Sequence, residues 1–230
     1  MRLTETVVRR ATGEEITPLT TVVADALMVQ PVGAWLVPDA AERPAVLRRY
    51  AHLVLARGLA HGQVDTTDDH AAVTVWYPRS EPPPPAATWM YDLHRRLGPH
   101  ASRFALLHAY VDAVLPYTPH HHLAHVAVRP GQDRALQALL ASYHRTLDAE
   151  GLPAYAELSS AHPREGVFAR LGYAPRSPVL LAPGGPALWR MWRPRPGTRV
   201  PGGLPRRVRL HRSATPLRGP VAPAAPPRSP

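Results

Sequence analysis

The chain has 230 residues, 45% of them hydrophobic, which allows one domain with a sizeable core. It contains no cysteine, which excludes disulfides, thiolate metal sites and a cysteine nucleophile. No apolar run approaches the length of a membrane span, and the charged N-terminus lacks an apolar signal segment. We therefore expect a soluble, cytoplasmic protein without a membrane partner.

The net charge of +10 is concentrated at the C-terminal end of the chain. All 27 basic residues are arginines, and eight of them fall within residues 195–230, which contain no acidic residue. Subtracting eight from 27 leaves 19 arginines against 17 acidic residues in residues 1–194, a balance of +2. The high isoelectric point therefore says little about what the rest of the chain binds.

The N-terminal residues predict a strand followed by a helix. Residues 4–11 have the β-branched character of a strand. Thr17 and Pro18 predict an N-cap followed by proline at the first helical position. The helix is expected to run through Met28 and to end before Pro31.

A second helix and a second strand are predicted next. Asp39 and Glu42 have the spacing of a capping box, and Gly58 and Gly62 are expected to close the helix. Its apolar positions follow helical spacing and are Val46, Leu47, Tyr50, Leu53 and Val54. The β-branched and aromatic residues 71–78 predict a strand.

The middle of the chain is predicted to be a loop and two helices. The proline run at 81–85 must be a loop, because proline can neither donate to a sheet nor continue a helix. Residues 89–97 and 101–115 have helical patterns and are separated by a Gly-Pro pair at 98–99.

Strand, helix, strand and short helix are predicted to follow in that order. Residues 122–130 predict a strand, and residues 135–150 predict a helix with one apolar face, capped by Gly151. Residues 154–160 predict another strand, and residues 163–171 a short helix. This alternation indicates an α/β (α+β) domain with helices flanking a sheet.

A hairpin and a tail complete the predicted organisation. Residues 178–181 and 187–192 flank a Pro-Gly-Gly-Pro turn and predict a hairpin. Residues 195–230 are rich in arginine, proline and glycine and cannot bury enough surface to offset their ordering entropy. We therefore predict one folded domain over residues 1–194 and a disordered tail over residues 195–230.

The block from His122 to Tyr173 resembles the Gcn5-related N-acetyltransferases. A strand ending in VAVRP (126–130) is followed by the loop GQDRALQ (131–137) and a helix. LDAEGLPAYAELSS (147–160) resembles the exit of that family's central helix and its next strand. VFARLGYAP (167–175) resembles the family's last short helix. The resemblance implies an acetyl-CoA-dependent enzyme with a mixed sheet.

The family's binding mode implies how acetyl-CoA would be held. The backbone of Val126 and Val128 would face the pantetheine arm, and the turn before the helix would contact the diphosphate. The residues implied to bind the cofactor are Val126, Val128, Gln132, Asp133, Arg134, Ala135, Leu136, Ser159 and Phe168.

Two positions depart from the family pattern. The diphosphate loop is short and keeps only Gly131, with Ala135 and Gln137 near positions that are glycine in relatives. Phe168 stands where many members have a tyrosine that protonates the departing thiolate, and phenylalanine has no hydroxyl. Three interpretations follow: an active acetyltransferase, an impaired relative with a CoA-binding or interaction role, and an unrelated α/β domain.

The predicted catalytic residues are Glu157 and His125, because N-acetyl transfer requires a base that removes a proton from the amine. Glu157 lies in the middle of its predicted strand, and His125 alternates with Leu123 and Ala127, so it is expected to share their face. Histidine has the more suitable intrinsic pKa. The alternatives are a hydrogen-bonded buried glutamate and a packed histidine.

A run of histidines and a set of aromatic residues give weaker indications of function. Neighbouring residues of the run 120–122, all histidine, would point to opposite faces of a strand, so no metal site is predicted. The aromatic residues Trp35, Trp76, Trp89 and Tyr91 could line an acceptor pocket, although core packing is the better-supported interpretation.

The expected function is acetyl transfer from acetyl-CoA to a small-molecule amine by a monomer or homodimer. The arginine-rich tail has no interleaved aromatic residues, so nucleic acid is not predicted as a partner.

Overall fold

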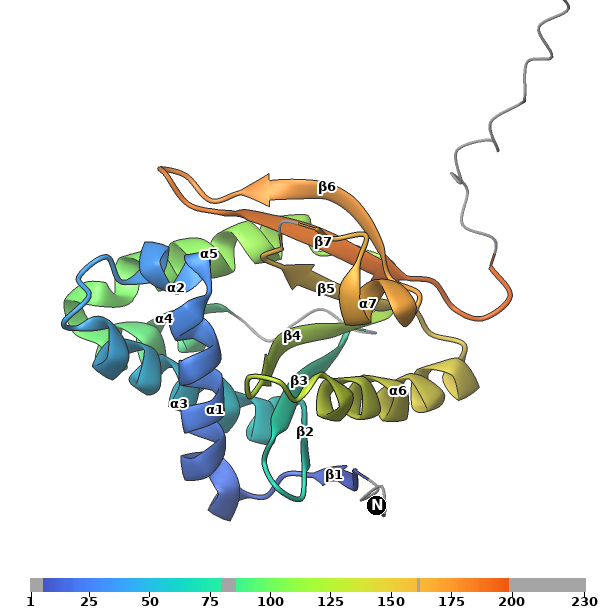
Figure 1. Cartoon of the computed structure of the whole chain (residues 1–230). Helices are drawn as coiled ribbons and strands as arrows, with labels where there is room; N and C mark the ends of the chain where they lie inside the picture. Colours follow the sequence, from blue (N-terminus) through green and yellow to red (C-terminus); the bar gives the residue numbers. More distant parts are fainter. Residues whose placement is uncertain (1–5, 80–85, 161, 199–230) are drawn as a thin grey trace, which may run out of the picture. The chain divides into compact units, whose positions relative to one another are not determined.

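The computed structural model describes residues 6–79, 86–160 and 162–198 (Figure 1). The described residues form one compact unit. The proline loop predicted at 81–85 and nearly all of the tail predicted from residue 195 lie outside the described residues. None of the helices in the described ranges is long and apolar enough to cross a membrane.

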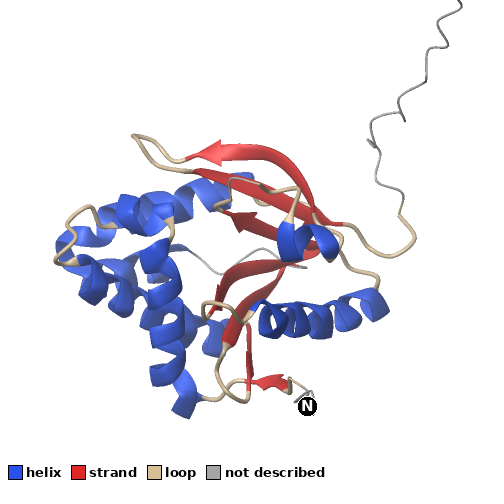
Figure 2. Ribbon diagram, in the orientation of Figure 1, coloured by secondary structure: helices blue, strands red, loops and turns tan. Residues whose placement is uncertain are grey.

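The described residues contain a mixed sheet with the order β1-β2-β3-β4-β5-β7-β6 (Figure 2). Its strands are β1 (Val8–Arg10), β2 (Gln63–Thr67), β3 (Ala72–Arg79), β4 (His120–Val128), β5 (Ala154–Leu158), β6 (Ala174–Leu180) and β7 (Ala187–Arg193). Only the central pair of neighbours, β4 and β5, is parallel. The predicted mixed sheet and the C-terminal hairpin are confirmed.

Helices cover both faces of this sheet. They are α1 (Ile16–Val29), α2 (Pro31–Leu36), α3 (Arg43–His61), α4 (Ala86–Leu97), α5 (Ala101–Val114), α6 (Asp133–Glu150) and α7 (Gly166–Arg170), with short 3₁₀ turns η1 (Gly13–Glu15) and η2 (Gly98–His100). Helices α1 and α3 pack on one face of β2–β4 and α6 packs on the other (Figure 1). The predicted helical flanks are therefore confirmed.

The start of the first helix differs from the prediction. The chain enters α1 through η1, so Glu15 is the N-cap, and Thr17 already lies in the first turn. Pro18 is the third helical residue, where its missing N–H is tolerated because N–H groups of the first turn have no intrahelical acceptor. Pro31 ends α1 as predicted and also opens α2, a short helix that the sequence pattern did not reveal.

The boundaries of α3 also differ from the prediction. Asp39 accepts a hydrogen bond from the Ala41 N–H at 2.8 Å in the preceding turn, and the helix itself begins at Arg43. Gly58 does not close the helix. A Cβ there would lie 2.6 Å from Val75 Cγ1, so glycine permits close packing of α3 on the sheet. The helix ends at Gly62, and strand β2, which was not predicted, follows at once.

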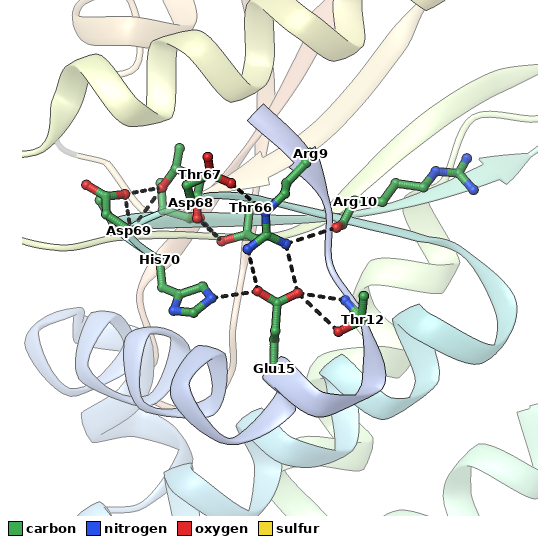
Figure 3. A network of polar contacts seen from close by, with 11 residues as sticks. Arg9, Arg10, Thr12, Glu15, Thr66, Thr67, Asp68, Asp69 and His70 are labelled. Carbon is green, nitrogen blue, oxygen red and sulfur yellow. Dashed lines mark hydrogen bonds and ion pairs between the residues drawn. The ribbon is translucent and has the colours of Figure 1, made fainter. Parts of the chain in front are cut away.

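A polar network ties the N-terminal strand to the β2–β3 turn (Figure 3). Glu15 lies at its centre and accepts hydrogen bonds from Arg9 at 2.6 and 2.9 Å, from His70 at 2.7 Å and from the Thr12 N–H at 2.9 Å. Arg9 also donates to Asp68 at 2.6 Å. The Arg9 contact, followed by that of His70, lowers the pKa of Glu15 well below its usual range. These contacts hold the three-residue strand β1 at the edge of the sheet.

The sheet separates two main apolar cores. One core fills the space between the sheet and α1–α5, and the other lies beneath α6 and α7. In the second core Trp76 stacks on Tyr143 with ring centroids 4.1 Å apart. Trp35 and Trp89 belong to the first core. These three tryptophans therefore serve core packing, as the better-supported interpretation predicted.

Candidate active site

A β-bulge interrupts strand β4 at its middle. Val75 of β3 lies opposite His125 and the next residue, Trp76, lies opposite Leu123, so Ala124 is an extra residue. A bulge of this kind shifts the alternation of side chains between the two faces. Leu123 consequently packs in the core beneath α6, whereas Ala127 packs in the core beneath α1 and α3. The prediction that His125 shares a face with both residues is therefore wrong for Leu123.

Strands β4 and β5 separate soon after they begin to pair. Their parallel register covers only 121–123 against 154–156. Both strands continue, to Val128 and Leu158, without a further pair between them in the described residues. The strands thus form a fork, in which the later part of β4 has no partner strand on the β5 side.

The backbone of β4 faces the open side of this fork. The Arg129 N–H donates to the Ala71 carbonyl of the β3 side at 2.8 Å. Because N–H groups in an antiparallel pair alternate in direction along a strand, those of Val126 and Val128 point away from β3 and toward the fork. This placement supports the predicted role of both residues.

The turn that leads from β4 into α6 presents unpaired backbone N–H groups. Gly131 adopts a φ of +77°, and Gln132 forms the N-cap of α6. Within the described residues, the N–H groups of Gly131, Asp133 and Arg134 have no hydrogen-bond acceptor. The N-terminus of a helix of this length, with its N–H groups free, favours an anion.

Some of the residues predicted to contact the diphosphate have backbone N–H groups that are already hydrogen-bonded within the protein. The Ala135 and Leu136 N–H groups donate to the Gln132 carbonyl at 2.9 and 3.4 Å, and both side chains are buried in the core. The free N–H groups therefore include those of Asp133 and Arg134, two of the predicted contacts, and that of Gly131, which was not among them. The exposed side chain of Asp133 places a carboxyl group at the same turn.

A cavity of about 580 Å³ passes through the fork. One end is formed by the start of α6 and by α7, with Asp133, Leu136 and Phe168 among its walls. The middle is formed by β4 and β5, and the other end by α1, α2, α5 and β7. The fork thus connects the free N–H groups of α6 to the helical layer on the opposite face.

Glu157 is paired with a histidine that the sequence analysis did not select. The His122 Nε2–H donates to Glu157 Oε2 at 2.8 Å, and the two side chains are 4% and 8% exposed. Among the described residues, His122 Nδ1 and Glu157 Oε1 are buried and have no hydrogen-bond partner. The sequence could have indicated His122 by its position, because it lies, like Glu157, on a central strand.

His125 also lines the cavity and neighbours a second polar pair. Its ring meets Tyr50 edge to face at 6.0 Å, and the hydroxyl of Tyr50 lies 3.1 Å from His108 Nε2. Burial, and then the neighbouring His122, lower the pKa of His125 to about 4. Burial, followed by His125, lowers the pKa of His108 to about 3. Both rings are neutral near pH 7.

The remaining predicted contacts lie at the fork and at α7. Ser159 lines the cavity beyond the end of β5, and Phe168 lines it from α7. The Phe168 ring packs against Tyr173 at 5.2 Å, and the sequence of α7, GVFAR, contains no hydroxyl. The hydroxyl of Tyr173 is turned to His144, so it does not replace the missing tyrosine.

Of the histidine run and the aromatic residues singled out in the sequence, only His122 lines the cavity in the described part of the chain. His121 points to the face opposite His122 and contacts the hydroxyl of Tyr143 at 2.9 Å, as strand alternation predicts. The described residues contain no group of three or more possible metal ligands. None of the four aromatic residues considered for an acceptor pocket lines the cavity, and Tyr91 is exposed.

Comparison with solved structures identifies acetyltransferases. A Corynebacterium glutamicum protein of the group "histone acetyltransferase HPA2 and related acetyltransferase" matches with a TM-score of 0.60 at 21% identity, over 85% of this chain and 99% of its own. Arylalkylamine N-acetyltransferase 2 from Aedes aegypti matches with a TM-score of 0.56 at 11% identity, over 82% and 98%. No family model matches the sequence, and no curated protein does either. These similarities establish that the chain has the fold of acetyltransferases.

Proposed function

We propose that this chain, which has the fold of the Gcn5-related N-acetyltransferases, transfers an acetyl group from acetyl-CoA to an amine. The observation that carries the proposal is the fork between β4 and β5. Unpaired backbone N–H groups of β4 lie along one cavity there, and Asp133, whose N–H group is also unpaired, forms part of its wall at the start of α6. A cosubstrate with a diphosphate and an amide-containing arm matches this arrangement of donors.

Two groups of residues are proposed to bind different parts of acetyl-CoA. The N–H groups of Gly131, Asp133 and Arg134 would hold the diphosphate, and the backbone of Val126 and Val128 would pair with the pantetheine arm. The arm would place the acetyl thioester in the middle of the cavity, beside Glu157 and His122.

The pair formed by His122 and Glu157 is proposed to take the proton of the amine. The amine nitrogen forms a bond to the acetyl carbon, the carbon–sulfur bond breaks, and one proton leaves the nitrogen. A carboxylate that accepts a hydrogen bond from one ring nitrogen stabilises the imidazolium formed when the other nitrogen is protonated. Among the described residues His122 Nδ1 is buried without a hydrogen-bond partner, so no existing bond has to break when it takes that proton. The thiolate takes its proton from water, because α7 offers no hydroxyl.

His125 is assigned a different role from the one suggested by its intrinsic pKa. Burial lowers its pKa to about 4, so the ring is a weak base in the folded protein. A neutral imidazole can still donate a hydrogen bond to the amine that enters the cavity, or accept one from it. We therefore propose His125 as a residue that orients the acceptor.

Calorimetric titration with acetyl-CoA tests this function directly. Binding with a stoichiometry of one, together with thiol release when an amine is added, is the expected result. Binding without thiol release over a broad panel of amines would favour the alternative of a catalytically impaired protein. Absence of binding at millimolar acetyl-CoA would contradict both.

The substitution Asp133→Asn is expected to strengthen acetyl-CoA binding. The carboxylate of Asp133 lies at the turn proposed to hold a diphosphate, and like charges a few ångströms apart in water repel by about 1 kcal/mol. Removing it should lower Kd by about fivefold at low ionic strength. The gain should shrink at 1 M salt, where the screening length is about 3 Å.

Glu150→Gln is the matched control for this measurement. Glu150 ends the same helix, about 25 Å from Asp133 at 1.5 Å per residue, and its substitution removes the same charge. If both variants changed Kd equally, the diphosphate would not lie at the start of α6.

A further inference from the structure

The end of the cavity formed by α1, α2, α5 and β7 is apolar. Nine aliphatic side chains line it, and Val23, Leu36 and Leu188 among them are 6% exposed or less. Val29, at the end of α1, is 84% exposed and marks the rim. This end lies across the fork from the α6 turn and is therefore the side from which an acceptor would reach the thioester.

Few polar atoms interrupt this apolar wall. Among the described residues at this end, polar side chains come only from Gln30, Tyr50 and His108. Tyr50 and His108 are hydrogen-bonded to each other, and burial keeps the pKa of His108 far below 7, so neither carries a charge. Gln30 is half-buried and its side chain makes no capping bond to α2.

The charged residues of the cavity lie elsewhere. Asp133 and Glu165 lie at the α6 and α7 end, and Glu157 lies in the middle, paired with His122. No arginine occurs among the described residues that line the cavity. The wall thus provides no carboxylate for a second ammonium group and no guanidinium for a carboxylate.

This apolar wall is expected to discriminate between amines by the free energy needed to remove their charged and polar groups from water. A buried ion without a counter-ion is strongly disfavoured, and so is a hydroxyl that loses its hydrogen bonds to water. A diamine or polyamine would bury an ammonium group against aliphatic side chains. An amino acid would bury its carboxylate there, and an amino sugar would bury several hydroxyls. An amine with an apolar skeleton has none of these costs and gains from burial of its carbon atoms.

We propose that the acceptor is a monoamine whose single nitrogen is attached to an apolar alkyl or aryl group. The inference rests on the proposed function, because it assigns the substrate class of that same cavity. The nitrogen lies at the fork near Glu157 and His122, and the apolar group fills the space between α1, α2, α5 and Leu188.

Matched pairs of amines test this assignment. Hexylamine is compared with 1,6-diaminohexane, and 2-phenylethylamine with phenylalanine, so each pair differs by one charged group. The kcat/KM of the monoamine is expected to exceed that of its partner by at least about 100-fold, because burying an unpaired ion costs several kcal/mol. Equal or reversed preference in both pairs would overturn the proposal.

The variant Gln30→Glu provides a second, independent readout. It adds a carboxylate to the acceptor wall with almost no change in shape, at the N-cap of α2, where a negative charge is tolerated. The ratio of kcat/KM for hexylamine to that for 1,6-diaminohexane should fall by about tenfold. The uncharged control Gln30→Met should not lower it. An unchanged ratio in Gln30→Glu would show that the second amine does not lie along this wall.

Binding of the amines alone separates this proposal from the proposed function. The rise in melting temperature with millimolar hexylamine should exceed that with 1,6-diaminohexane, whether or not acetyl-CoA is bound. If acetyl-CoA failed to bind while this order held, the transferase function would be wrong and the apolar amine site would stand. If acetyl-CoA bound and was used but the diamine was preferred, the function would stand and the substrate class would be wrong.

Discussion

Replacing Glu157 by glutamine is expected to lower kcat by about 10²- to 10⁴-fold, the usual contribution of a positioned general base. Glutamine keeps the size of the side chain but cannot stabilise an imidazolium at His122 Nε2, 2.8 Å away. The Kd for acetyl-CoA should remain within about threefold, because the proposed cofactor contacts are backbone groups of β4 and α6. Stopped-flow or single-turnover assays with a saturating amine measure the effect.

Two further variants make this result specific. His122→Asn should cause a loss of similar size, and the double variant should be little worse than either single one, because the two residues act as a unit. His125→Asn should reduce kcat by less than about tenfold, since a ring whose pKa is lowered to about 4 is a weak base near pH 7. If His125→Asn proved more damaging than Glu157→Gln, the assignment of the base would be reversed.

The free energy of unfolding is expected to fall steeply as the pH decreases from 7 to 5. Burial, the largest cause in each case, lowers the pKa of His108 to about 3 and those of His125 and His144 to about 4. Below the ordinary histidine value of 6.5, the unfolded chain binds protons at these positions while the folded protein does not. Stability therefore falls with decreasing pH, by at most about 1.4 kcal/mol per pH unit for each histidine.

Urea unfolding followed by circular dichroism at several pH values between 7 and 5 measures this slope. Burial raises the pKa values of the carboxyl groups of Asp65 and Asp112, which opposes the histidine effect but is common to all the variants compared. His144→Gln removes one buried histidine, which bonds Tyr173 at 3.0 Å, and should reduce the slope by at most about 1.4 kcal/mol per pH unit. His52→Gln changes an exposed histidine of α3 and is the control. An equal change of slope in both variants would contradict the explanation by burial.

The regular elements with strong local patterns were predictable from the sequence. The helix from residue 135 has an apolar stripe at helical spacing and a glycine at its end, and α6 ends at Gly151 with a φ of +67°. The β-branched run at 71–78 is buried as strand β3. Each signal is contained within a few neighbouring residues, so local sequence suffices to specify the element.

Elements with a weak local sequence pattern were not predicted, because their structure depends on partners elsewhere in the chain. Strand β2 has the sequence QVDTT, without alternation of apolar and polar side chains, and it is a strand because β1 and β3 pair with it on both sides. The start of α1 is set by η1 and by the contacts of Glu15 with Arg9 and His70, which is 55 residues away. Such partners cannot be recognised from local propensity.

The sequence by itself determined the order of strands and helices around the fork, and it placed Glu157 and His125 on the two central strands. Only the tertiary structure decided the partners and the burial of these two groups. The bulge at Ala124 changes which side chains share a face, the separation of β4 and β5 opens the cavity, and burial keeps His125 neutral while Glu157 meets His122. Each of these effects depends on atoms that are distant in sequence and adjacent in space, and on the loss of water around them.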